Sequence, residues 1–171
     1  MPNYKIYIEN RYESWKTFKD DTFDVVEYNI DPMKHKLFSD DVFSDENSKI
    51  TIIHSTTRNI KSIPGVLLLE KNKTYGKKKN KFLYKCVPDD IRLPVFLIPY
   101  ELKNIGFSKK YENKYVTFNF DSWDNQHPYG TLINTIGDVS KLENFYEYQL
   151  YCKSLNASIQ KFSRNTAKVL K

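Results

Sequence analysis

Short runs in which apolar and polar residues alternate, separated by proline and glycine, constrain the fold of this chain most. In VTFNF, residues 116–120, the apolar Val116, Phe118 and Phe120 alternate with polar residues. Successive side chains of a strand point to opposite faces, so these three residues share one face. A second strand is predicted over 131–136, after a turn that contains proline and glycine. The pattern indicates a fold rich in β-structure.

Three further strands are predicted in the middle of the chain. An apolar run at 66–69 is followed by a polar hairpin loop around Gly76 and by a partner strand at 82–87. Three prolines between 88 and 99 predict that the next segment is an edge strand or an extended wall, because proline cannot donate a hydrogen bond to a neighbouring strand. The total of five strands is typical of an OB-type barrel.

The first third of the chain predicts a smaller β lobe. Alternation at 4–8 indicates a strand, and the segment with Trp15 and Phe18 is expected to be a short helical or extended link. Further strands are predicted at 23–28, 42–43 and 50–54.

Beyond residue 142 the apolar period becomes that of a helix. Ser140 is a candidate N-cap, with Glu143 three positions later completing a capping box. One apolar stripe at spacings of three and four is formed by Phe145, Tyr148, Cys152, Leu155, Ile159 and Phe162. This stripe can either pack back on the barrel or dock a partner.

The predicted fold class is therefore mainly β, with OB-type barrels followed by a C-terminal amphipathic helix. A chain of 171 residues fits one domain or two small lobes that share a core. The predicted division is an abbreviated first lobe over 1–60, an OB-like domain over 61–140 and a helical linker over 141–171.

Positive charge gathers in the middle of the chain. Residues 61–110 carry 12 basic and 4 acidic side chains, whereas the net charge of the whole chain is +6. Between residues 71 and 85 there are seven lysines and no acid, interleaved with Tyr75, Phe82 and Tyr84. Lysines attract backbone phosphates, and unpaired bases stack on aromatic rings for roughly 1–3 kcal/mol each. The mixture is typical of single-stranded RNA binding, although a lysine run can also keep a sheet edge soluble.

The candidate RNA-binding residues are cations and aromatic residues of this central region and of the strand that follows it. They are Lys73, Lys77, Lys78, Lys79, Lys81, Phe82, Tyr84, Arg92, Phe118 and Phe120. Two alternatives stay open: the two last phenylalanines can pack in the barrel core, and Arg92 can pair with the carboxylates at 89 and 90. Trp123 is expected to anchor its loop rather than to stack on a base.

Residues for catalysis or metal binding are not grouped in the sequence. His35, His54 and His127 stand in different segments, and Cys86 and Cys152 are too far apart for a metal-type pair. We therefore expect no catalytic residue, no metal site and no cofactor in this chain.

A membrane protein is not expected either. No apolar run approaches the 18 or more residues that a span needs, and the first ten residues have no signal-peptide core. With two cysteines that a reducing compartment would keep as thiols, the expected location is cytoplasmic.

The segment 114–139 resembles the end of the second cold-shock domain in ribonuclease II, ribonuclease R and the catalytic exonuclease of the exosome. The matching residues are Val116, Phe118, Phe120, Asp121, Trp123, Pro128, Gly130, Ile136 and Gly137. Residues 63–100 resemble the earlier strands of the same domain, and 35–43 resemble the end of the first cold-shock domain. The bias toward lysine, asparagine and tyrosine is typical of an AT-rich genome, and large DNA viruses encode members of this family.

The resemblance implies a single-stranded RNA-binding front end of a 3′ to 5′ exoribonuclease, which guides RNA to a catalytic domain in cis or in trans. The clustered aspartates that bind Mg²⁺ in that catalytic domain have no counterpart here, since the aspartates occur as isolated pairs. We therefore expect no hydrolysis by this chain alone. One alternative is a protein interaction module that acts through the C-terminal helix. Another is a free-standing nuclease that uses Asp89, Asp90 or Asp121.

Overall fold

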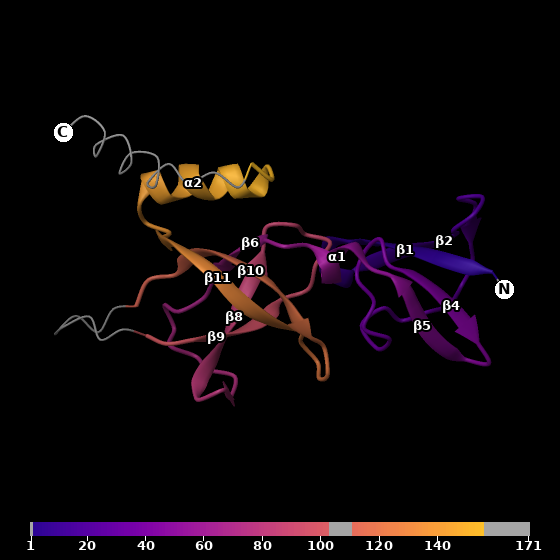
Figure 1. Cartoon of the computed structure of the whole chain (residues 1–171), viewed down its shortest axis with the longest axis horizontal. Helices are drawn as coiled ribbons and strands as arrows, with labels where there is room; N and C mark the ends of the chain where they lie inside the picture. The colour runs from indigo at the N-terminus through magenta and orange to yellow at the C-terminus, as the bar shows by residue number, and fades with distance from the viewer. Residues whose placement is uncertain (1, 103–110, 156–171) are drawn as a thin grey trace.

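The computed structural model describes residues 2–102 and 111–155 of the chain. It is mainly β, with two lobes side by side and a helix across one of them (Figure 1). Within the described residues, no helix combines the length and apolar character needed to cross a membrane.

The first lobe is a five-stranded antiparallel sheet with the order β3-β2-β1-β4-β5. Its strands are β1 (Asn3–Glu9), β2 (Ser14–Lys19), β3 (Val25–Val26), β4 (Val42–Glu46) and β5 (Lys49–His54), and a short 3-10 helix, η1 (Asn10–Tyr12), joins the first two. Alternation along β1 turns Ile6 and Ile8 inward, where both are fully buried with Phe43. The segment with Trp15 and Phe18, expected to be a helical or extended link, is extended and forms β2. The strand predicted over 23–28 is shorter than expected and consists of β3 alone.

The second lobe is a closed barrel. Its strands are β6 (Ile63–Leu67), β7 (Lys77–Lys78), β8 (Lys81–Pro88), β9 (Phe96–Tyr100), β10 (Lys114–Ser122) and β11 (Tyr129–Asp138). The sheet order is β6-β10-β11-β9-β8-β7, and an added β6–β8 pairing closes the ring of five long strands. Strands β9 and β11 run parallel, whereas the other pairs are antiparallel. The predicted OB-type fold is confirmed.

One detail of the barrel prediction is wrong. Strand β9 carries Pro99 yet lies between β8 and β11 rather than at an edge. Its pairing with β11 is limited to Leu97 and Tyr129, so Pro99 lies beyond the parallel pairing and can do without an N–H.

Two glycines make room for the ring of Phe118 inside the barrel. A Cβ on Gly130 would lie 2.7 Å from Cδ2 of Phe118, and one on Gly65 would lie 3.1 Å from its Cε1. The ring therefore fills the space that two absent side chains leave, and Phe118 is fully buried.

The two lobes share a core. Phe38 of the first lobe packs among barrel residues that include Phe96, Phe120 and Trp123. Beside it, the guanidinium of Arg58, from the short helix α1 (Thr56–Asn59) between the lobes, donates to the buried Asp41 at 2.6 Å. Trp123 is 6% exposed, as expected for a loop anchor.

Helix α2 (Leu142–Cys152) packs on β6, β10 and β11, and its Tyr148 stacks on Tyr115 with ring centroids 4.3 Å apart. The predicted cap is wrong: Lys141 is the N-cap, and Ser140 donates to Glu112 at 2.5 Å instead. The predicted stripe is also only partly the packing face.

On α2 the buried residues are Asn144, Glu147 and Tyr148, whereas Phe145 of the predicted stripe is 38% exposed. Leu155, just past the helix, is 62% exposed. Two further members of the stripe, Ile159 and Phe162, lie outside the described residues.

Candidate nucleic-acid interface

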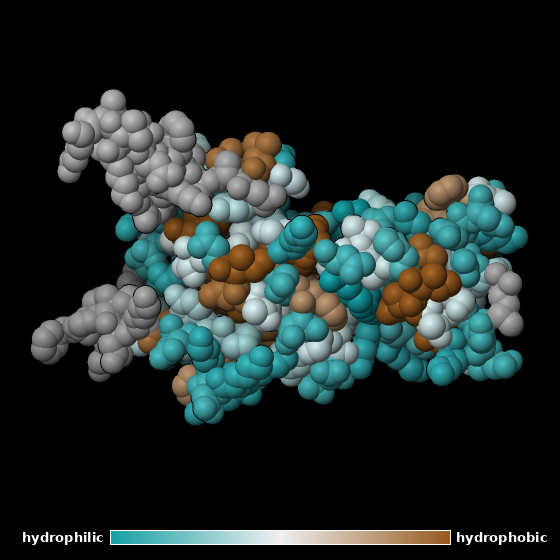
Figure 2. Space-filling model, viewed as in Figure 1, coloured by the Kyte–Doolittle hydropathy of each residue, from teal (hydrophilic) through white to brown (hydrophobic). Residues whose placement is uncertain are grey.

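The basic hairpin, residues 71–81, ends in a two-residue turn at Lys79 and Asn80. Both residues have positive φ, 50° and 63°, which is the type I′ geometry that suits the twist of paired strands. Because β7 pairs with β8 through the residues on either side of this turn, Lys79 stands at the tip, fully accessible to a ligand. Figure 2 shows hydrophilic side chains covering this part of the second lobe.

Several lysines of the hairpin lie over aromatic rings. Lys77 Nζ is 4.5 Å from the ring centroid of Phe82, and Lys73 and Lys85 approach Tyr75 at 5.4 and 4.8 Å. Such contacts hold the ammonium groups loosely and in water, because a cation over an exposed ring gains only about 0.5–1 kcal/mol. Phe82 itself is 45% exposed. Rings and cations are thus presented together on one surface.

A groove runs beside the hairpin, over the outer side of β9 and β11. Its two adjoining hollows, of about 590 and 700 Å³, share Lys79, Lys81, Tyr100 and Glu101. One hollow continues over the β11 residues Thr131, Leu132 and Thr135, and the other over Phe82, Tyr84 and Tyr111. The volumes are within the range of ordinary ligand sites.

The structure brings together the predicted Lys77, Lys79, Lys81 and Phe82, which are all exposed. Lys73 lies in the same hairpin and is also exposed. Lys78 differs from them, because its ammonium forms an ion pair with Asp121 at 2.5 Å.

Three predicted aromatic residues do not present their rings. Tyr84 is 2% exposed and Phe118 is fully buried, so neither ring can stack on a base. Phe120 is half-buried against the core, with Arg58 5.4 Å from its ring centroid. Core packing, the alternative for Phe118 and Phe120, is what the structure shows. Closure of the barrel accounts for Tyr84, since its strand contributes one face to the interior.

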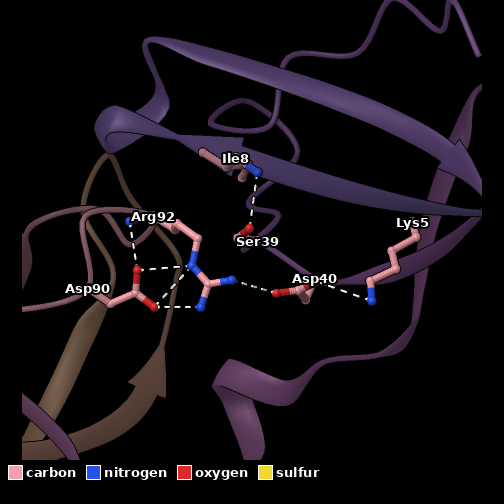
Figure 3. A network of polar contacts seen from close by, with 6 residues as sticks. All are labelled: Lys5, Ile8, Ser39, Asp40, Asp90 and Arg92. Carbon is pink, nitrogen blue, oxygen red and sulfur yellow. Dashed lines mark hydrogen bonds and ion pairs between the residues drawn. The ribbon is translucent and has the colours of Figure 1, made fainter. Parts of the chain in front are cut away.

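Arg92 does not line the groove but lies at the joint between the lobes (Figure 3). It donates to Asp90 at 2.8 Å and to Asp40 at 2.9 Å, and Asp40 also pairs with Lys5 at 3.2 Å. Burial acts to raise the pKa of the Asp90 carboxyl, but hydrogen bonds from Arg92 and its charge outweigh this and hold the pKa below its usual value. Arg92 therefore forms the structural ion pair that was the alternative to a phosphate contact.

His127 lies in the connection between β10 and β11, residues 123–128, near the same surface. Partial burial and the nearby charge of Lys85 hold the pKa of His127 below its usual value. Its imidazole is consequently neutral at neutral pH, and the positive charge of this surface comes from lysines.

Two groove residues, Tyr100 and Glu101, were not predicted. Tyr100 pairs with Phe82 across β8 and β9, so only the register of these strands places it in the groove. The residues around Tyr100 in the sequence do not indicate that it lies in the groove.

Comparison with known proteins finds a family match within the second lobe. Residues 83–148 match the family model of the Dis3-like cold-shock domain 2. No curated protein sequence matches the chain significantly.

Two solved structures share the fold at low sequence identity. Yeast Ssd1, described as a pseudonuclease, is 14% identical with a TM-score of 0.56, over 86% of this chain and 24% of its own. The apo form of Mycoplasma genitalium RNase R is 15% identical with a TM-score of 0.52, over 89% of this chain and 24% of its own. The chain thus spans about a quarter of the length of these proteins. Residues 83–148, which include most of the barrel, are similar to the Dis3-like cold-shock domain 2, and the predicted resemblance to the cold-shock region of the ribonuclease II and ribonuclease R family is confirmed.

Proposed function

We propose that this chain binds single-stranded RNA in the groove beside the basic hairpin. The observation that carries the proposal is the shared lining of the two hollows, which combines the tip lysine Lys79 and Lys81 with the half-buried ring of Tyr100. Lysines supply the sequence-independent attraction to phosphates, and exposed rings supply stacking for unpaired bases. The exposed ring of Phe82 borders the same groove.

The position of the groove in the fold supports this assignment. OB-folds bind oligonucleotides on the face of their second and third strands, between the first and last connecting loops. In this barrel those strands are β8 and β9, and the basic hairpin belongs to the first connection. A duplex would present only its backbone here, whereas a single strand can use both the lysines and the rings.

We further propose that the bound RNA is guided to a catalytic ribonuclease domain of the ribonuclease II and R type, joined in cis or acting in trans. Support comes from the match to the Dis3-like domain and from the shared fold with RNase R. Within the described residues, no group of three histidine, cysteine, aspartate or glutamate side chains is placed to hold a metal ion. Hydrolysis, with its Mg²⁺, is assigned to the catalytic domain.

The test is fluorescence anisotropy of a labelled single-stranded RNA at two salt concentrations, with a magnesium-containing sample run on a denaturing gel. The variant changes the exposed Lys77, Lys79 and Lys81 to glutamate, and the matched control changes the exposed first-lobe residues Lys16, Lys19 and Lys49 in the same way. We expect the first variant to lose binding and the control to keep most of it, with intact RNA on the gel. Equal loss in both would reduce the proposal to a net-charge effect.

A second candidate function is protein interaction through α2. Although one face of α2 packs on the barrel, Leu142 and Tyr146 are 63% and 56% exposed on its other side. If this candidate is the function, Leu142→Ser with Tyr146→Ser abolishes it, and the three lysine changes leave it intact.

A further inference from the structure

Lys78 stands apart from the other lysines of the basic hairpin. Its Nζ lies 2.5 Å from Oδ2 of Asp121, 3.4 Å from Oγ of Ser122 and 4.4 Å from the ring centroid of Tyr129. The side chain is 29% exposed, whereas the lysines on either side of it point into solvent. Among described residues, Lys78 is the lysine between 71 and 85 that forms an ion pair.

The contacts of Lys78 join two parts of the barrel that no strand pairing connects. Asp121 and Ser122 end β10, and Tyr129 begins β11, while β7 lies at the other end of the sheet order, beyond β8. The ammonium of Lys78 therefore links the basic hairpin, which lies between β6 and β8, to the end of β10 and the start of β11. The hairpin lines both hollows of the groove, and Lys78 and Asp121 themselves line one of them.

Among the described residues, the other contacts of the hairpin tip go to the adjoining strand β8. Hydrogen bonds of Tyr75 and Gly76 go to Leu83 of β8, and the pairing of β7 is also with β8. The ring contacts of Lys73 and Lys77 stay within the hairpin and β8. Within the described residues, Lys78 therefore supplies the link between the tip and the strands β10 and β11.

We propose that Lys78 is a positioning residue, which holds the basic hairpin at the width that a single strand of RNA requires; this inference rests on the proposed function. Its own charge is compensated by Asp121, so it has little to offer a phosphate. Lys79 and Lys81 line the same hollow as Lys78 but, among the described residues, form no ion pair, so they make the phosphate contacts instead.

Asp121→Ala distinguishes a positioning role of Lys78 from direct contact with phosphate, because the two roles predict opposite changes in RNA affinity. If Lys78 positions the hairpin, removing its acceptor weakens RNA binding by roughly three- to fivefold, as expected for the loss of an exposed ion pair. If Lys78 contacts phosphate, removing a nearby negative charge strengthens binding. Asp124→Ala is the matched control, since it removes an exposed acid from the same region without touching Lys78.

The salt dependence gives a second readout. Lys78→Met is expected to lower RNA affinity without changing the slope of log affinity against log salt, whereas Lys79→Met reduces that slope by about one phosphate contact. Lys78→Arg, which can still pair with Asp121 and lie over Tyr129, restores affinity. A slope reduced by Lys78→Met as much as by Lys79→Met would overturn the positioning role.

Hydrogen exchange tests the same inference without RNA. Loss of the bridge in Asp121→Ala is expected to speed the exchange of backbone amides in residues 73–81, and Asp124→Ala is expected to leave them unchanged. Unchanged exchange in Asp121→Ala would overturn the inference even if RNA binds as proposed. A different outcome is that Asp121→Ala speeds amide exchange in residues 73–81 but the wild-type chain binds no RNA. That result would overturn the proposed function and, with it, the role of Lys78 in RNA binding.

Discussion

The ring of Phe38, from the first lobe, lies parallel to the ring of Phe96 in the barrel, with centroids 5.9 Å apart and an angle of 5° between the planes. Both side chains are fully buried. The core of the barrel is therefore completed by a residue that the first lobe supplies. A consequence is that the two lobes should lose their structure together.

Phe38→Ala tests this coupling. Removing a buried phenylalanine typically costs about 3–5 kcal/mol, because transfer energy is lost and a cavity remains. We expect the free energy of unfolding to fall by this amount, in a denaturant titration followed by both tryptophan fluorescence and circular dichroism. Two separate transitions, with the barrel transition unshifted, would contradict the shared core.

Gly130→Ala should destabilise the barrel by about 1–3 kcal/mol, because the added methyl group would meet the ring of Phe118 at 2.7 Å. The neighbouring Thr131 is exposed, and Thr131→Ala serves as the control, expected to change stability by less than about 0.5 kcal/mol. Thermal unfolding of both variants measures the difference. Equal midpoints would show that the ring moves aside freely.

Arg92→Met should raise the pKa of the Asp90 carboxyl, because burial, which raises it, then acts without the hydrogen bonds and charge of Arg92 that lower it. NMR titration of the Asp90 side chain checks the direction. The lowered pKa also means that this carboxylate stabilises the wild-type fold above the pKa of the unfolded chain, about 3.9, and that the contribution is lost as the pH falls through the folded value. Arg92→Met should remove this pH-dependent contribution to the free energy of unfolding. An Asp90 titration curve in Arg92→Met that matches the wild type would contradict the role of Arg92 in lowering the pKa.

Phe82→Ala should weaken RNA binding by about 1–3 kcal/mol, since Phe82 is 45% exposed and can stack on a base. The free energy of unfolding of the Phe82→Ala variant should change little. Phe23→Ala is the matched control, because it removes an exposed phenylalanine of the first lobe that does not line the groove, and it should bind RNA as the wild type does. Anisotropy titrations of the three proteins compare them, and a Phe82→Ala chain with wild-type affinity would remove this ring from the interface.

Glu101→Gln should tighten RNA binding a few-fold. Glu101 shares the groove with Lys79 and Lys81, and among the described residues it forms no ion pair that would compensate its charge. Removing a carboxylate near bound phosphates lowers the repulsion, most strongly at low salt. An affinity that falls instead would indicate that the carboxylate accepts hydrogen bonds from RNA bases.

The strands could be predicted because alternation is a local property. Strands β1 and β10 carry a regular apolar alternation, and the five-strand barrel was predicted from the segments that form β6, β8, β9, β10 and β11. The place of β9 could not be predicted in this way, since Pro99 argued for an edge and only the ring closure puts the strand inside.

The candidate site was predicted in part for the same reason. A dense lysine run identifies the basic hairpin from the sequence alone, and its exposed Lys73, Lys77, Lys79 and Lys81 were among the predicted residues. Burial of Tyr84 and the pairing of Lys78 with Asp121, 43 positions away, depend on how the barrel closes. Likewise, Arg92 meets Asp40 only because the two lobes come together.

The central claim is that RNA lies in the groove between the basic hairpin, the end of β9 and the outer side of β11. NMR chemical-shift mapping of the isotope-labelled chain, titrated with a short single-stranded RNA, tests it most directly. We predict that the perturbed amides cluster at residues 77–82, 100–101 and 131–135, and that the shifts collapse as salt is raised. Perturbations confined to α2 or to the first lobe, or none at low salt, would contradict the account.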